Sequence, residues 1–221
     1  MFIRQDGPEL EVLAPAKINL FLEVTGKRDD GFHDLDMLMV PVALYDTVKL
    51  ILQQSPEISL TSRWAFGLES QPALPPAHEN LVIQALELFQ QHLQEKHGKS
   101  FGLSVDLVKR IPAAAGLGGA SSDAAAALVG ANRLNGNLLS LEELTFMAAQ
   151  VGSDVPFFLY KSPARCQGRG EKVTPVSSPQ PLPVVLVKPT AGLSTPSVFG
   201  RVAEFGFEDR QSIDDMLQVF T

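Results

Sequence analysis

The stretch Arg110–Ala127, R-I-P-A-A-A-G-L-G-G-A-S-S-D-A-A-A-A, combines residue types that could bind a phosphate group. Gly116, Gly118 and Gly119 stand between a strand-like pattern and a helix-like pattern. Glycine permits positive φ and lets the backbone come close to a ligand. The helix that follows begins with unpaired N–H groups and with the positive end of its dipole. These features predict a phosphate site that needs no cationic side chain.

Three other phosphate-binding loops do not fit this stretch. A dinucleotide-binding fingerprint requires a glycine three residues after Gly118, where the chain has Ser121. A Walker A loop ends in Gly-Lys-Ser/Thr, but no lysine lies between Arg110 and the end of the loop. The protein-kinase glycine loop lacks the same glycine and connects two strands. A tight turn whose small residues allow close packing remains the alternative to phosphate binding.

Asp154 is the candidate general base. It lies in G-S-D-V-P-F-F, residues 152–158, between a glycine and an apolar segment that predicts partial burial. A buried carboxylate needs a cationic partner, and Lys17, on a strand near Pro15, is a candidate. In the alternative interpretation Asp154 caps a short helix over 155–160, and Lys17 is solvated.

The patterns around these residues indicate strands first and helices later. Residues 10–25 read as extended structure broken at Pro15, with Lys17 and Asn19 on one face. An apolar run at 35–44 and strand patterns at 47–53 and 58–62 follow a polar turn at 27–31. This β-rich first quarter favours an α+β fold over a doubly wound parallel sheet, which alternates strands and helices from the start.

The remaining sequence predicts several further elements. A loop over 63–79 precedes a helix that Asn80 caps and Gly98 ends, and an alternating strand at 101–107 leads into the glycine loop. The other predictions are helices at 121–135 and 141–151 (capped by Ser140), a hairpin at 164–176, a strand at 183–188, a short helix that opens at 193–196 and holds Phe199, and an amphipathic segment at 209–221.

The bulk composition limits the classes of function. The 221 residues are 45% hydrophobic and 19% charged, enough for a sizeable core in one large domain or two small ones. A net charge of −7 argues against non-specific nucleic-acid binding. The single cysteine, Cys166, excludes an intrachain disulfide and a cysteine-rich metal site, and the four histidines show no HExxH spacing. Without a signal peptide or a membrane-spanning run, we expect a cytoplasmic protein with no membrane partner. The oligomeric state is not predicted.

The loop Pro-x-x-x-Gly-Leu-Gly-Gly-Ala-Ser-Ser resembles the phosphate loop of the GHMP kinases, such as galactokinase, homoserine kinase and mevalonate kinase. P-A-K-I-N-L-F-L at 15–22, G-F-H-D-L at 31–35 and G-S-D-V-P-F-F at 152–158 extend the likeness. From about residue 10 to 200, the chain resembles the GHMP family that phosphorylates 4-diphosphocytidyl-2-C-methyl-D-erythritol in the non-mevalonate isoprenoid pathway. The resemblance implies a GHMP kinase fold, with a β-rich N-terminal ATP-binding lobe (ribosomal protein S5 domain 2-like) over 1–160 and a shortened C-terminal lobe over 161–221.

The resemblance also implies roles for individual residues. Lys17 and Asp154 are implied to be the catalytic pair, with ATP and Mg²⁺ as cofactors and no residue singled out as a metal ligand. Asn80 and Leu81 match a site near the adenosine. The ATP phosphates would bind Pro112, Ala113, Ala114, Ala115, Gly116, Leu117, Gly118, Gly119, Ala120, Ser121 and Ser122. The pocket for a cytidine diphosphate substrate would contain Asn19, Phe32, His33, Thr195 and Phe199. Phe32 and Phe199 could stack on cytosine, although core packing is the alternative for both.

The chain departs from the family after Asp209. Family members continue further and carry a later glycine-rich segment beside the phosphate loop, and nothing like it follows here. We therefore expect a chain truncated at its C-terminus. The predicted reaction is ATP-dependent phosphorylation of the 2-hydroxyl of the cytidine diphosphate substrate. The alternatives are a GHMP kinase for another small alcohol and a catalytically impaired nucleotide-binding homologue.

Overall fold

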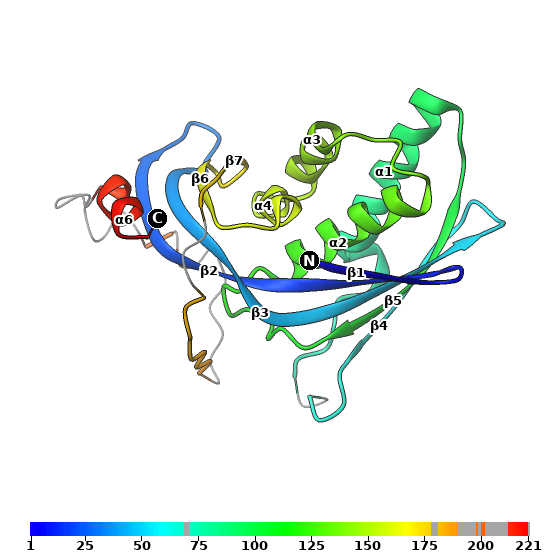
Figure 1. Cartoon of the computed structure of the whole chain (residues 1–221), viewed down its shortest axis with the longest axis horizontal. Coiled ribbons are helices and arrows are strands. Elements are labelled where there is room, and N and C mark those ends of the chain that lie inside the picture. The colour runs from blue at the N-terminus through cyan, green and yellow to red at the C-terminus, as the bar shows by residue number, and fades with distance from the viewer. Residues whose placement is uncertain (69–70, 178–180, 190–197, 199, 202–211, 221) are drawn as a thin grey trace.

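The computed structural model describes residues 1–68, 71–177, 181–189, 198, 200–201 and 212–220. Over these ranges a curved, mainly antiparallel sheet carries helices on one face (Figure 1). The sheet contains no βαβ alternation at its start, since its first four strands follow one another directly. The predicted α+β class is therefore confirmed.

Two long strands form the centre of the sheet. The described strands are β1 Phe2–Asp6, β2 Glu9–Lys27, β3 His33–Gln53, β4 Ile58–Trp64, β5 Gly102–Lys109, β6 Ala164–Gly168 and β7 Lys172–Pro175. They are ordered β1-β2-β3-β5-β4, while β6 pairs with β3 and β7 pairs with β6. Among these pairs only β4 with β5 is parallel. β3 thus joins β5, which leads into the glycine loop, to the β6–β7 hairpin.

Both central strands differ from the sequence prediction. The expected break at Pro15 is wrong: β2 continues through it, with a register shift between Pro15 and Ala16. A β-bulge tolerates a proline because the ladder is locally interrupted there, so the missing N–H leaves no backbone hydrogen bond unmade. The apolar run 35–44 and the strand 47–53 are parts of one strand, β3, because β2 pairs along nearly its whole length.

The described helices are η1 Ala77–Glu79, α1 Leu81–His97, α2 Gly119–Leu134, α3 Leu141–Val151, α4 Val155–Tyr160 and α6 Ile213–Phe220. Helices α1, α2 and α3 begin and end close to the predicted residues, whereas η1 lies within the predicted loop 63–79. Asn80 caps α1 by accepting the N–H of Val82 at 3.0 Å, and Gly98 ends it with φ 63°. Ser140 and Glu143 form a capping box at the start of α3. These caps confirm both predicted helix starts.

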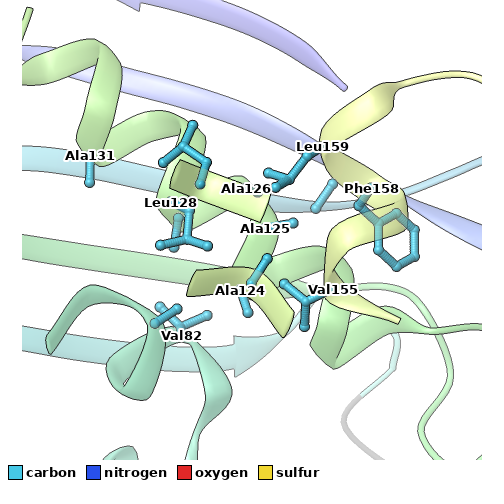
Figure 2. Close-up of a cluster of buried hydrophobic side chains, with 14 of the residues drawn as sticks. Val82, Ala124, Ala125, Ala126, Leu128, Ala131, Val155, Phe158 and Leu159 are labelled. Carbon is cyan, nitrogen blue, oxygen red and sulfur yellow. The ribbon is translucent and has the colours of Figure 1, made fainter. Parts of the chain in front are cut away.

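Helix α2 packs at the centre of the helical layer through small side chains. Figure 2 shows Ala124, Ala125, Ala126, Leu128 and Ala131 among side chains of α1 and α4. From those helices come Val82, Val155, Phe158 and Leu159. Alanine leaves little bulk between two backbones, so neighbouring helices can approach closely. This packing brings α4 against the start of α2, where the glycine loop ends.

The later part of the chain confirms two predictions and contradicts one. The 164–176 hairpin is present as β6 and β7, and α6 buries Ile213 and Phe220 against Leu38. The predicted strand 183–188 is wrong: residues 181–189 form no regular element, and Val185 and Val187 are exposed. A strand requires a hydrogen-bonded partner, and this run pairs with no described strand. The helix expected to open at 193–196 lies outside the described residues, as do Thr195 and Phe199.

Candidate active site

Lys17 and Asp154 lie together although the sequence places them far apart. The Lys17 Nζ atom is 3.4 Å from Asp154 Oδ2 and 3.3 Å from Asn19 Oδ1. The Lys17 side chain is 7% exposed and that of Asp154 is 30% exposed. The ammonium is thus nearly buried between a carboxylate and an amide oxygen, while the carboxylate keeps access to solvent. The expected ion pair and the shared face of Lys17 and Asn19 are both confirmed.

Asp154 occupies the N-cap position of α4 without capping it. Its side chain makes no hydrogen bond to the first turn of the helix, which argues against the capping alternative. Gly170, in the β6–β7 turn, has φ 121°, and a Cβ there would lie 3.4 Å from Asp154 Oδ1 and from the Ser153 carbonyl oxygen. A glycine at this position therefore lets the hairpin turn approach Asp154 closely.

The glycine loop is hydrogen-bonded to the strand that carries Lys17. The Lys17 N–H donates to the Leu117 carbonyl oxygen at 2.9 Å. Ala114, Gly116 and Gly118 have φ of 51°, 70° and 68°, so the loop turns repeatedly through the left-handed region. α2 begins directly after Gly118 with no side-chain cap, which leaves its first N–H groups without a side-chain acceptor. Alternating backbone conformations and an uncapped helix start are the geometry of a backbone anion site.

Gly118 packs directly against the ion pair. A Cβ at this position would lie 3.0 Å from Lys17 Cγ and 3.0 Å from Phe158 Cζ. The loop, Lys17 and α4 are therefore in contact, with Asp154 at the start of that helix. The arrangement places an ammonium and an accessible carboxylate beside a backbone anion site.

Comparisons with known proteins agree with this geometry. Residues 80–162 match the family model described as GHMP kinases N terminal domain. A crystal structure of 4-(cytidine 5'-diphospho)-2C-methyl-D-erythritol kinase superposes with a TM-score of 0.72 at 34% identity, over 95% of this chain and 70% of that one. A 4-diphosphocytidyl-2-C-methyl-D-erythritol kinase from Brevibacillus brevis is 40% identical over 95% of this chain and 68% of its own length. This chain belongs to the 4-diphosphocytidyl-2-C-methyl-D-erythritol kinase family. The GHMP kinase fold is therefore confirmed as well.

The chain covers only part of the length of another member of this kinase family. The relative from Geobacillus sp. is 43% identical over 190 residues, which are 86% of this chain and 62% of the relative. The chain thus spans about three fifths of the length of that kinase. Among the residues that the structure describes, no helix is long and apolar enough to cross a membrane. The cytoplasmic location stays a prediction.

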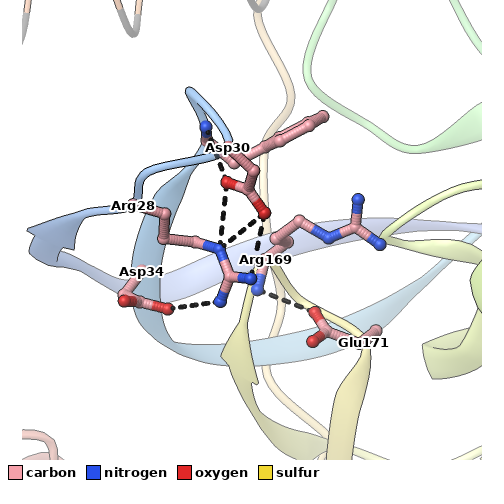
Figure 3. Close-up of polar contacts among 6 residues, drawn as sticks. Arg28, Asp30, Asp34, Arg169 and Glu171 are labelled. Carbon is pink, nitrogen blue, oxygen red and sulfur yellow. Dashed lines mark hydrogen bonds and ion pairs between the residues drawn. The ribbon is translucent and has the colours of Figure 1, made fainter.

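The turn at 28–34 carries Phe32 and His33, which are predicted to line the substrate pocket. Ion pairs hold this turn in place. Figure 3 shows Arg28 between Asp30, at 3.0 Å, and Asp34, at 3.2 Å. The Phe32 N–H donates to Asp30 Oδ1 at 3.1 Å. The hydrogen bond from Arg28 holds the pKa of Asp30 below its usual value. These contacts fix the backbone that presents Phe32 and His33.

Phe32 is a surface residue, which contradicts the core-packing alternative for this side chain. It is 50% exposed, and the Arg169 guanidinium carbon lies 4.9 Å from its ring centroid. Arg169 comes from the β6–β7 turn, where its N–H donates to Glu171 Oε2 at 2.7 Å. An exposed ring with a cation on its face can also stack on a flat base. His33 is the first residue of β3 and is half-buried beside Phe32.

Asn80 and Leu81 lie at the start of α1, which packs against α2. The Asn80 side-chain oxygen is engaged in its cap, and Leu81 is partly buried against the core. The contact of Asn80 and Leu81 with adenosine stays a prediction. Thr195 and Phe199 lie outside the described residues.

Sequence reasoning missed a buried charged cluster under the loop. Lys109, at the end of β5, contacts both Asp46 of β3 and Asp123 of α2. The signal was present for Lys109, because it continues the alternation of Leu103, Val105 and Leu107 on the buried face of β5. For Asp123, the signal was a charged residue within a helix rich in alanine. Arg169 was also missed, although it stands between two glycines of a predicted hairpin turn.

Proposed function

We propose that this protein transfers the γ-phosphoryl group of ATP to the 2-hydroxyl of 4-diphosphocytidyl-2-C-methyl-D-erythritol. The observation that carries the proposal is the contact between the Lys17–Asp154 pair and the glycine loop, made through the Lys17 N–H and the Leu117 carbonyl oxygen. A phosphoryl-transfer site must place the acceptor hydroxyl, its base and the phosphate within one small region. The names of the family relatives support the choice of substrate.

Asp154 is proposed as the group that orients and deprotonates the acceptor hydroxyl. Its carboxylate is partly exposed and is not used as a helix cap, so it can accept a proton from a bound alcohol. Lys17, 3.4 Å away, is proposed to offset the negative charge that develops on the transferred phosphoryl group. As the hydroxyl oxygen bonds to γ-phosphorus, the bond from γ-phosphorus to the bridging oxygen of ADP breaks.

The glycine loop is proposed to hold the phosphates through the residues 112–122, with Asn80 and Leu81 near the adenosine. The described residues contain no cluster of three or more His, Cys, Asp or Glu side chains that could hold a metal. Mg²⁺ usually binds phosphate oxygens together with water and at most one or two carboxylates. We therefore propose that Mg²⁺ arrives with ATP. Its charge would offset that of the phosphates, and no residue of the described chain is assigned to it.

The cytidine diphosphate pocket is proposed to include Asn19, Phe32 and His33, joined by Thr195 and Phe199 from outside the described residues. Phe32 is exposed on a turn that is fixed by Arg28, as a stacking surface requires. The division into an ATP-binding lobe over 1–160 and a partial lobe over 161–221 also stays a proposal. In the structure β6, from the second range, pairs with β3 of the first.

The test is phosphorylation of 4-diphosphocytidyl-2-C-methyl-D-erythritol by the purified chain with ATP and Mg²⁺, followed by mass spectrometry of the product. Asp154→Asn should lower turnover by roughly 10²–10⁴-fold, the usual size of a general-base effect, with ATP affinity little changed. Asp106→Asn is the matched control, because this surface carboxylate pairs with Arg63 on β4 and has no assigned role at the site.

Three outcomes would change the proposal. Near-normal turnover of folded Asp154→Asn would remove Asp154 from the mechanism. Phosphate transfer to another small alcohol, with no preference for the cytidine compound, would favour a different GHMP kinase. ATP binding without any turnover would favour the catalytically impaired homologue.

A further inference from the structure

A buried cluster of one lysine and two aspartates lies under the glycine loop, and no step of the proposed mechanism uses it. The Nζ atom of Lys109 contacts a carboxylate oxygen of Asp46 and one of Asp123. The three side chains are 9%, 0% and 2% exposed, respectively. Burying charged groups this deeply costs free energy unless they are well paired with one another. The net charge of this cluster is therefore important.

The cluster connects both ends of the loop. Asp46 Oδ1 accepts the N–H groups of Arg110 and Ile111, where the chain enters the loop. Asp123 lies near the start of α2, where the chain leaves it. Between these ends, a Cβ on Gly119 would lie 3.3 Å from Lys109 Nζ, so the ammonium is directly behind the first residue of α2. Any change of charge in the cluster therefore acts on the backbone that is proposed to hold phosphate.

The two carboxylates are not equivalent. Both oxygens of Asp46 are occupied, Oδ1 by two backbone N–H groups and Oδ2 by Lys109. Asp123 uses Oδ2 for Lys109, but its buried Oδ1 has no hydrogen-bond partner within the described part of the chain. Two ionised carboxylates with one ammonium would leave a net negative charge in a buried site. A proton on the unpartnered Oδ1 of Asp123 removes that net charge and displaces none of the hydrogen bonds described above.

We propose that Asp123 is a positioning residue that holds a proton in the ATP-binding form of the loop, and that loss of this proton weakens ATP binding by leaving a net negative charge beneath the phosphates. The inference rests on the proposed function, because it takes ATP as the ligand of the loop. Asp123 acts through the loop and touches neither ATP nor the acceptor hydroxyl.

The pKa values agree with this assignment. Burial raises the pKa of Asp123 to about 8; the negative charge of Asp46 adds to the increase, and Lys109 opposes it. For Lys109, burial acts to lower the pKa, but the two carboxylates outweigh it and raise the pKa above its ordinary value. Below about pH 8 the cluster is therefore neutral, and above that pH it carries one negative charge.

The other elements that pack around α2 do not supply a further charged group that faces Asp123. From β2, Lys17 forms its ion pair with Asp154, and Glu9 and Glu11 pair with Lys49. On α1, Glu87, Glu95, Lys96 and His97 are exposed, and His92 pairs with Glu143 of α3. On α3, Glu142 is exposed, and Glu143 also pairs with Lys96. α4, V-P-F-F-L-Y, contains no Asp, Glu, Lys, Arg or His. The charged groups that face Asp123 are thus Lys109 of β5 and Asp46 of β3.

Calorimetric titration with ATP and Mg²⁺ between about pH 7 and 9.5 tests the inference. This range lies above the pKa of phosphate groups, which is about 6. We expect the wild-type Kd to rise by about tenfold across pH 8, because one added negative charge beneath the loop repels the phosphates. Asp123→Asn should keep the low-pH affinity at every pH, because asparagine has the shape of the neutral acid. Asp106→Asn is the control and should follow the wild type.

Proton uptake provides a second measurement that needs no variant. Titrations of the wild type near pH 8 in buffers of different ionisation enthalpy should show protons taken up as ATP binds, because binding favours the protonated cluster. A pH-independent Kd together with no proton uptake would overturn the inference and leave the proposed function intact. Absence of ATP binding at every pH would overturn the proposed function, and the inference with it.

Discussion

Replacing Gly118 by alanine tests the contact between the glycine loop and the Lys17–Asp154 pair. Two costs add at this position. The backbone has φ 68°, which costs an L-residue about 1–2 kcal/mol. The new Cβ would also lie 3.0 Å from Lys17 Cγ and from the ring of Phe158, which is buried against α2. Overpacking of this kind typically costs about 1–3 kcal/mol.

Gly98 supplies the matched control. It ends α1 with φ 63°, and a Cβ there would have nothing within 4 Å. Gly98→Ala should therefore lose only the backbone term, about 1–2 kcal/mol of the free energy of unfolding. Gly118→Ala should lose about 1–3 kcal/mol more, the overpacking term. It should also lower turnover, because the Lys17 side chain has to move away from Asp154.

Urea unfolding of both variants measures the stability difference, and steady-state kinetics measure the effect on the site. An equal loss of stability in the two variants, with normal turnover in Gly118→Ala, would refute the close packing of the loop against Lys17. A loss of turnover in Gly98→Ala as large as in Gly118→Ala would show that backbone strain alone explains the kinetic effect.

Two further predictions concern single elements. Asn80→Ala should lower the free energy of unfolding by about 0.5–2 kcal/mol in urea denaturation, because it leaves the Val82 N–H without its cap; an unchanged unfolding midpoint would contradict the cap. Cys166 should resist thiol reagents in the folded chain and react at once in denaturant, because burial, aided by the negative charge of Asp154, raises its thiol pKa to about 12. Rapid labelling of the native protein would contradict that burial.

Local sequence determined the features that depend on a few neighbouring residues. The Asn80 cap, the capping box of Ser140 and Glu143, and the hairpin at 164–176 were all predicted, since each is made within one turn or one pair of short strands. The glycine loop and the helix after it were predicted for the same reason. The strand expected at 183–188 was wrong because apolar composition alone does not supply a pairing partner.

Tertiary structure decided which of these features meet. The sequence marked Lys17 and Asp154 separately, but their 3.4 Å contact exists because β2 passes the glycine loop while α4 packs on the alanines of α2. The cluster of Lys109, Asp46 and Asp123 likewise depends on the pairing of β3 with β5 and on the position of α2 above them. Periodicity shows which face of an element is buried, but not which buried charge on another element it will touch. That choice follows from strand register and helix packing, which are fixed only when the whole core assembles.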